Sequence, residues 1–259
     1  MNSKKACLLD GVKILGRQGF WEIKLANGKI SSIRNTGKRG NGFITPRFAD
    51  IHVHLDKTGT ANRLPRRAHS LIDAIELMNY DKCFWTWEDI FSRAKWGINH
   101  AWQNGTGFIR THIDWVNSEI PMAWDILKAL RLEWKGRVEI QLASLSPIEL
   151  LMTDGAAIAA RVKSDNGILG AFAYRNENIE EKIANVFRLA EKFDVELDFH
   201  IDEGLEKEAT GFDTVVSYAK TFGMKKKVLC GHACSLSLRN KSYLFGLLDK
   251  VAKAEIGLT

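Results

Sequence analysis

The sequence predicts an α/β fold of the (β/α)₈ TIM-barrel type, incomplete, with about six βα units behind a small N-terminal β element. Three observations support this prediction. Short apolar runs alternate with segments of helical apolar spacing, which is typical of a parallel sheet. Histidines stand at the C-terminal ends of several of these runs, where barrel enzymes place their chemistry. The first 45 residues instead alternate like short antiparallel strands.

The N-terminal residues predict a separate small domain. Residues 21–25 and 29–33 have strand character, and Asn27-Gly28 between them is a typical hairpin turn. We therefore expect residues 1–45 to form the N-terminal strands of a small β-sandwich domain and residues 46–259 to form a partial barrel.

The barrel strands are predicted from apolar, partly β-branched runs. They lie near residues 48–54, 107–113, 137–144, 167–173, 195–200 and 227–232. The first run is not followed by a glycine-rich phosphate loop, which argues against a dinucleotide-binding Rossmann fold. A seventh strand begins at residues 255–259, where the sequence ends. Because six βα units cannot close an eight-stranded barrel, we expect a truncated version of a longer enzyme.

Composition narrows the class of protein. The chain has 259 residues, 45% of them hydrophobic, and a formal charge of +6. Its lysines and arginines are spread along the chain without a nucleic-acid-binding motif, so we expect no nucleic-acid partner. No apolar run is long enough to span a bilayer, and the N-terminus lacks a signal-peptide core. Four cysteines in a chain of this length do not form a disulfide framework, which favours a cytoplasmic location.

Two histidines on the first barrel strand form the first candidate site. His52 and His54 are two residues apart, so a strand directs both side chains to one face. Two such imidazoles make half of a transition-metal site, or are simply two polar residues on one strand face. His200 and His232 end later strands, and Glu203 follows His200 by three residues. The combined pattern is far more specific than any one histidine.

Taken together, these motifs resemble the amidohydrolase superfamily and, within it, the cytosine deaminase-like group. The resemblance implies that His52, His54 and His200 bind one divalent metal ion, Fe²⁺ or Zn²⁺. It implies that Glu203 moves protons to the ring nitrogen and the leaving amine, and that His232 orients and deprotonates the attacking water. The lysine that bridges two metals in other members is missing from strand 167–173, which implies a mononuclear site.

Three further residues have two interpretations each. Lys57 follows the His-x-His motif and is either a substrate-side residue or a salt-bridged lysine at the barrel mouth. His112 and Asp114 end the second barrel strand. They either contribute to the site, as support for the metal ligands or as substrate-binding groups, or fill the barrel with polar side chains.

The resemblance implies a small heterocyclic substrate and a metal-dependent hydrolase that cleaves an exocyclic amino or cyclic amide C–N bond of a pyrimidine-like ring. It allows a homo-oligomer. Residues 145–149 lack the substrate-reading glutamine of cytosine deaminases, so a triazine, pterin or creatinine-like ring is an alternative. The family's fourth ligand, an aspartate from the eighth strand, is not in the sequence. A catalytically inactive remnant that binds a small molecule or partner is therefore the alternative to an enzyme.

Overall fold

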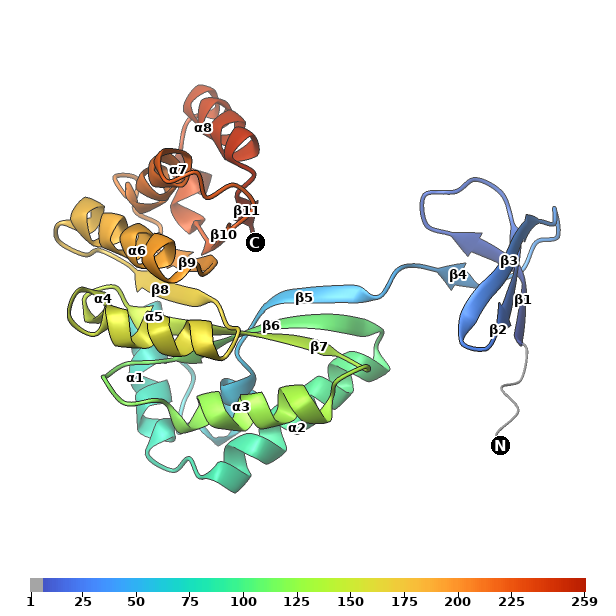
Figure 1. Cartoon of the computed structure of the whole chain (residues 1–259), viewed down its shortest axis with the longest axis horizontal. Helices are drawn as coiled ribbons and strands as arrows, with labels where there is room; N and C mark the ends of the chain where they lie inside the picture. The colour runs from blue at the N-terminus through green and yellow to red at the C-terminus, as the bar shows by residue number, and fades with distance from the viewer. Residues whose placement is uncertain (1–6) are drawn as a thin grey trace. The chain divides into compact units, whose positions relative to one another are not determined.

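The computed structural model describes residues 7–259, so residues 1–6 of the predicted 1–45 domain lie outside it. The chain divides into two units, with the boundary between Arg47 and Phe48. The first unit is a four-stranded sheet of order β3-β2-β1-β4 (Figure 1). Its strands are β1 (Cys7–Ile14), β2 (Trp21–Ala26), β3 (Lys29–Asn35) and β4 (Phe43–Ile44).

The second unit is built on a curled parallel sheet of seven strands. Their order in the sheet is their order in the chain, so each strand lies beside the next one. They are β5 (Phe48–Val53), β6 (Thr106–Asp114), β7 (Glu139–Pro147), β8 (Leu169–Ala173), β9 (Leu197–Ile201), β10 (Val228–His232) and β11 (Gly257–Leu258). The predicted incomplete barrel of six βα units followed by the start of a seventh strand is confirmed.

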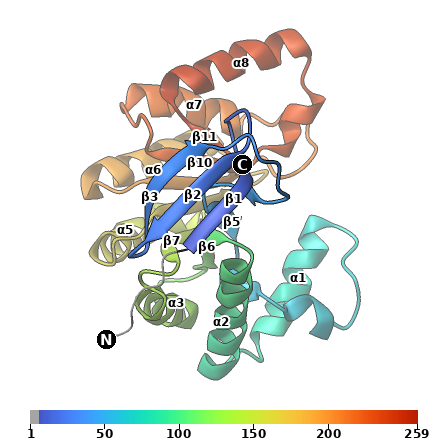
Figure 2. The same cartoon turned by 90° about the vertical axis from the view of Figure 1, so that its right-hand side faces the viewer.

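Helices follow the strands and lie on the outer side of the curved sheet (Figures 1 and 2). They are α1 (Leu71–Lys82), α2 (Trp87–Gln103), α3 (Met122–Glu133), α4 (Leu150–Thr153), α5 (Gly155–Ser164), α6 (Ile179–Phe193), α7 (Gly211–Thr221) and α8 (Lys241–Ala254). Short 3₁₀ turns occupy Leu55–Lys57, Thr60–Arg63 and Cys234–Leu238. None of the described helices has the length and apolarity that a membrane crossing requires.

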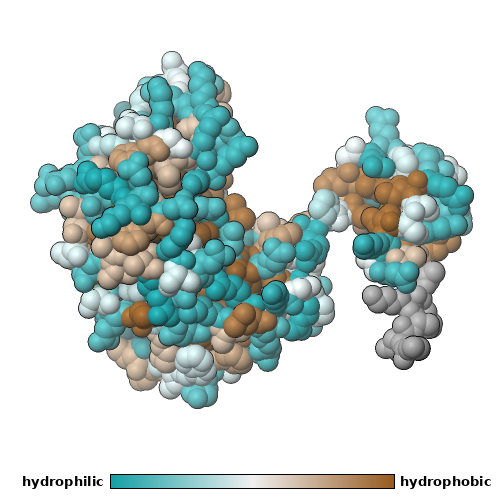
Figure 3. Space-filling view, in the orientation of Figure 1, coloured by the Kyte–Doolittle hydropathy of each residue, from teal (hydrophilic) through white to brown (hydrophobic). Residues whose placement is uncertain are grey.

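Local sequence explains where these helices begin and which side they bury. The Ser70 hydroxyl accepts a hydrogen bond from the Asp73 backbone amide and so caps the start of α1. The Thr86 hydroxyl accepts one from the Asp89 amide and caps α2 in the same way. Helix α6 turns a fully buried apolar stripe that includes Phe187 toward the sheet. The outer face of the second unit that Figure 3 shows is accordingly mostly hydrophilic.

A close approach of two backbones fixes the join between β7 and β8. Regular pairing of the two strands is confined to residues 146–147 and 171–172. A Cβ on Gly170 would lie 1.7 Å from the Ser144 carbonyl oxygen, so only glycine fits there. This glycine keeps the sheet continuous between the strands that carry the first and the later histidines.

Candidate active site

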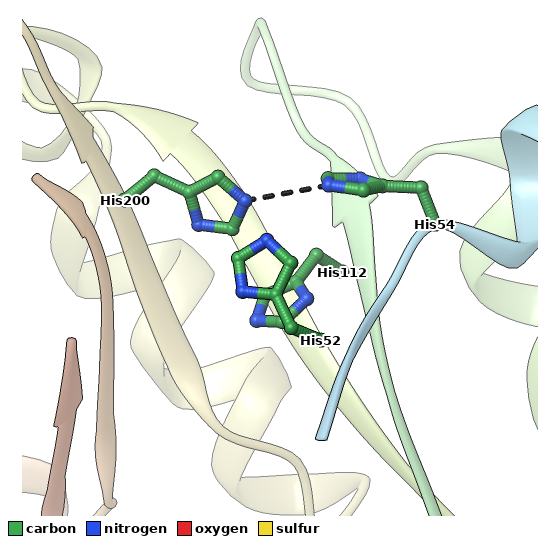
Figure 4. Close-up of side chains that lie close together, drawn as sticks. All are labelled: His52, His54, His112 and His200. Atoms are coloured by element: carbon green, nitrogen blue, oxygen red, sulfur yellow. Dashed lines mark hydrogen bonds between the residues drawn. The ribbon is translucent and has the colours of Figure 1, made fainter. Parts of the chain in front are cut away.

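Four histidines from three strands meet inside the curled sheet. His52 and His54 come from β5 and the residue after Val53, His112 from β6 and His200 from β9. One ring nitrogen from each lies within 4.8 Å of the others. Figure 4 shows the four rings directed toward one another, and we call them the histidine cluster. His52, His54 and His200, the predicted metal ligands, are therefore close together, and His112 lies with them.

Burial keeps the imidazoles of His52, His54 and His200 neutral. Burial, and then the neighbouring His112 and His232, lowers the pKa of His52 to about 4. Burial, with Lys57 as the next cause, lowers the pKa of His54 to about 2. Burial and the surrounding histidines also hold the pKa of His200 far below its usual value. Neutral imidazole is the form that binds metal ions.

The ring nitrogens fit a bound cation. Nε2 of His54 and Nε2 of His200 are 3.3 Å apart. Two tetrahedral ligands at zinc–nitrogen distances of about 2.0–2.1 Å are separated by about 3.3–3.4 Å. Both ring nitrogens of His52 are also buried with no hydrogen-bond partner among the described residues, so His52 has a free nitrogen for the same cation. Buried polar atoms are rarely left unpartnered, so the donor set fits a divalent metal.

His232 and Glu203 lie beside the cluster. The His232 ring is centred 4.8 Å from the rings of both His52 and His200. Its Nδ1 is 3.7 Å from Oε1 of Glu203, and its Nε2 is buried with no hydrogen-bond partner in the described chain. The backbone of His232 is left-handed, with φ of 71°, a conformation that turns the chain sharply at the end of β10. The two residues predicted to move protons thus share one end of the barrel with the cluster.

A glycine on β10 makes room for His52. A Cβ on Gly231 would lie 2.5 Å from Cε1 and 2.7 Å from Nδ1 of the His52 ring. The two strands are not neighbours in the sheet, so this contact crosses the barrel interior. The His52 ring can occupy this position only because residue 231 is a glycine, which has no side chain.

A second group of charges surrounds Lys57. Its ammonium is 2.8 Å from Oδ1 of Asp114, and Lys82 of α1 contacts the other oxygen of that carboxylate at 2.5 Å. Burial would lower the pKa of Lys57, but Asp114 and Asp56 outweigh it and raise the pKa. Burial would likewise raise the pKa of Asp114, yet Lys57 and Lys82 lower it to about 2. Both predicted residues are thus charged and paired with each other.

Burial, and then Asp114, raises the pKa of the fully buried Asp56 to about 6. Lys57 also interacts electrostatically with both His54 and Glu203. The charge of Lys57 therefore acts both on the histidine cluster and on the acid that is predicted to move protons.

Sequence reasoning missed four residues around the site. Lys82 and Asp56 complete the charged group around Lys57, and Asp198 and Arg110 lie beneath His112. The sequence could have indicated Arg110 and Asp198. Each stands two residues before a histidine of the cluster, so its side chain leaves the strand on the same face as that histidine. Lys82 lies on helix α1, and sequence spacing gives no indication that it pairs with Asp114 of β6.

Comparison with known proteins gives relatives over nearly the whole chain. No family model matches. The chain is 27% identical over 249 residues to pterin deaminase of Rhizobium rhizogenes, covering 92% of this chain and 57% of the relative. It is 26% identical over 238 residues to N-isopropylammelide isopropyl amidohydrolase of Pseudomonas sp., covering 86% of this chain and 58% of the relative. The chain therefore spans less than two thirds of the length of these relatives.

Solved structures share the fold. 5-Methylcytosine deaminase of Klebsiella pneumoniae with 5-fluorocytosine gives a TM-score of 0.82 at 21% identity, covering 97% of this chain and 65% of that chain. Atrazine chlorohydrolase of Arthrobacter aurescens complexed with zinc gives 0.65 at 12% identity, covering 97% and 64%. The predicted resemblance to amidohydrolases and deaminases is confirmed by the two curated relatives, a pterin deaminase and an isopropyl amidohydrolase, and the solved structures add the shared fold.

Proposed function

We propose that this chain carries the metal site of an amidohydrolase that cleaves an exocyclic amino or cyclic amide C–N bond of a small nitrogen heterocycle. The observation that carries the proposal is the convergence of His52, His54 and His200, whose imidazoles are kept neutral by burial, beside Glu203 and His232. These three histidines would hold one divalent ion, Zn²⁺ or Fe²⁺. Such an ion acidifies water toward neutral pH and stabilises negative charge on oxygen.

The chain's own residues account for the proton transfers. Nε2 of His232 is buried without a hydrogen-bond partner in the part of the chain that the structure describes, and in this proposal it accepts a proton from the attacking water. Glu203 transfers protons to the ring nitrogen and to the amino group, so the C–N bond breaks with loss of ammonia. The water oxygen remains on the ring carbon as a carbonyl, and the two protons of water end on the ring nitrogen and in ammonia.

The relatives suggest which ring to test first. Pterin deaminase matches 92% of this chain, and N-isopropylammelide hydrolase matches 86%. Residues 145–149 lack the glutamine expected for cytosine recognition. We therefore place a pterin first, an ammelide-type triazine second and cytosine third. Lys57, whose charge acts on both His54 and Glu203, is the residue that we assign to the substrate side.

Metal content is the first test. The purified chain is expected to hold about one zinc or iron ion per molecule, since its donors suit one such ion. His200→Ala should lose the ion, whereas His69→Ala, an exposed histidine outside the cluster, should keep it. Ammonia release from pterin, N-isopropylammelide and cytosine then follows. A folded chain that binds no metal would contradict the proposal and favour the non-catalytic alternative.

A further inference from the structure

The end of β5 lacks regular sheet pairing where it carries the cluster's histidines. Asp50 pairs with Ile109 of β6, but the next paired residue, Val53, lies opposite Thr111. Three steps along β5 thus match two steps along β6, and His52 lies within the irregular stretch. Among the described residues β5 pairs with no strand other than β6. Regular ladder bonds therefore do not fix the backbone around His54.

Two β6 side chains replace those bonds. The Leu55 amide donates to Oγ1 of Thr111 over 3.0 Å in a buried position. Nδ1 of His112 lies 3.4 Å from the Val53 carbonyl oxygen. Val53 and Leu55 are the residues on either side of His54, so the two contacts fix the peptide before it and the peptide after it.

His112 is itself anchored to the strand that carries His200. Its Nε2 lies 3.0 Å from Oδ1 of Asp198, and both side chains are completely buried. The other oxygen of Asp198 accepts from Nη1 of Arg110 at 2.9 Å, and Nε of Arg110 donates to Gln141 on β7 at 3.0 Å. Asp198 stands on β9 two residues before His200. A continuous polar chain therefore joins β5, β6, β7 and β9 beneath the cluster.

We propose that Thr111 and His112 are positioning residues that clamp the backbone on both sides of His54 and hold it opposite His200, with Asp198 fixing His112. The proposal rests on the proposed function in one respect, because the two histidines so aligned are assigned there as metal ligands. It explains why β6, which supplies none of the three assigned ligands, ends with buried polar side chains in the barrel interior.

The geometry also distinguishes this role from a fourth ligand. Nε2 of His112 lies 3.0 Å from a carboxylate oxygen of Asp198 without hydrogen-bond geometry, and its Nδ1 lies 3.4 Å from the Val53 carbonyl oxygen. By contrast, His52 has neither of its nitrogens engaged by a described residue. Because Nδ1 of His112 is directed at the backbone beside His54, we assign His112 to holding that backbone and not to binding the metal.

The clamp is tested first on the metal-free chain, by amide hydrogen exchange at Leu55. Thr111→Val keeps the side-chain shape but removes the acceptor, whereas Thr111→Ser keeps the hydroxyl. We expect exchange at Leu55 to be faster by about tenfold or more in the valine variant and close to wild type in the serine variant, since a buried donor has lost its partner. Unchanged exchange in the valine variant would overturn the clamp.

Metal affinity is the second readout, measured by competition with a chromogenic zinc chelator. Thr111→Val and His112→Gln should each weaken zinc binding by about 10–100-fold, as loss of groups that orient ligands does. In both variants the absorption spectrum of the cobalt-substituted protein should keep its wild-type band positions. A shifted cobalt spectrum in His112→Gln would identify His112 as a ligand and overturn the assignment. If the wild type binds no metal, the proposed function fails, while the exchange result still decides whether the clamp exists.

Discussion

Replacing Gly231 with alanine is the sharpest available test of how the cluster is built. The added methyl group would lie 2.5 Å from Cε1 of His52, whereas an ordinary contact begins near 3.4 Å. The His52 ring must therefore move by about 0.9 Å. It has little room, because its centre lies 4.5 Å from that of His112 and 4.4 Å from that of His200.

Metal–ligand distances are expected within about 0.2 Å of their usual values, and the required movement is several times larger than that. We expect Gly231→Ala to weaken zinc binding by at least about 10–100-fold. Overpacking the interior should also lower the free energy of unfolding by about 1–3 kcal/mol. The backbone of Gly231 is not left-handed, so alanine adds no backbone strain that would confuse the result.

The assay combines zinc affinity by chelator competition with urea denaturation. Gly246→Ala is the matched control, because that helix position of α8 has no atom within 4 Å of the added carbon. Alanine there should raise the free energy of unfolding by up to about 1 kcal/mol, through helix propensity, and leave zinc binding unchanged. If Gly231→Ala bound zinc like the wild type, His52 would not be a ligand held in the position described.

Three further substitutions test the fold and the charged groups. Gly170→Ala should place the protein in the insoluble fraction, because its Cβ would overlap the Ser144 carbonyl oxygen at 1.7 Å; soluble, normally melting protein would contradict the β7–β8 geometry. Asp165 accepts from three donors on α3 and α5. Although burial would raise its pKa, those donors lower it to about 2. The resulting stability, roughly 2 kcal/mol, is present above about pH 4 and lost as pH falls toward 2. Urea denaturation of Asp165→Asn should therefore show that loss at pH 7 and little difference from wild type at pH 2. Asp114→Asn leaves two partly buried ammonium groups without their carboxylate, and we expect a cost of about 2–3 kcal/mol by urea denaturation. A variant as stable as the wild type would show that the ion pair between Lys57 and Asp114 does not contribute to the free energy of unfolding.

Much of the architecture was predictable because strand-forming runs and amphipathic helices alternate in the sequence. The run ending at His200 is a strand in which every residue is buried, and the segment after the next loop forms α7. Parallel strands bring their carboxyl ends to one edge, so His52, His54 and His200 could be expected to meet. This prediction required only the order of strands and helices along the chain.

The supporting groups were harder to predict. Asp198 stands in an apolar strand, where a carboxylate usually signals an exposed face, yet it is completely buried against His112. Its burial depends on Arg110, a partner 88 positions earlier in the chain. The need for glycine at position 231 depends on a contact between two strands that are not neighbours in the sheet. Such pairings arise from the curvature of the sheet, which local sequence does not encode.

The position of β5 links metal binding to local unfolding. This strand and the residue that follows it carry two of the three assigned ligands, and among the described residues the strand is paired along one side only. A strand paired on one side is expected to detach at a lower free energy than the strands at the sheet's centre. A metal held jointly by β5 and β9 would add to that free energy, by about 4 kcal/mol when the free ion is at a thousandfold excess over its dissociation constant. Metal supply would then set how often residues 48–54 become accessible to a protease, so the ion would protect the chain from degradation as well as serve its chemistry.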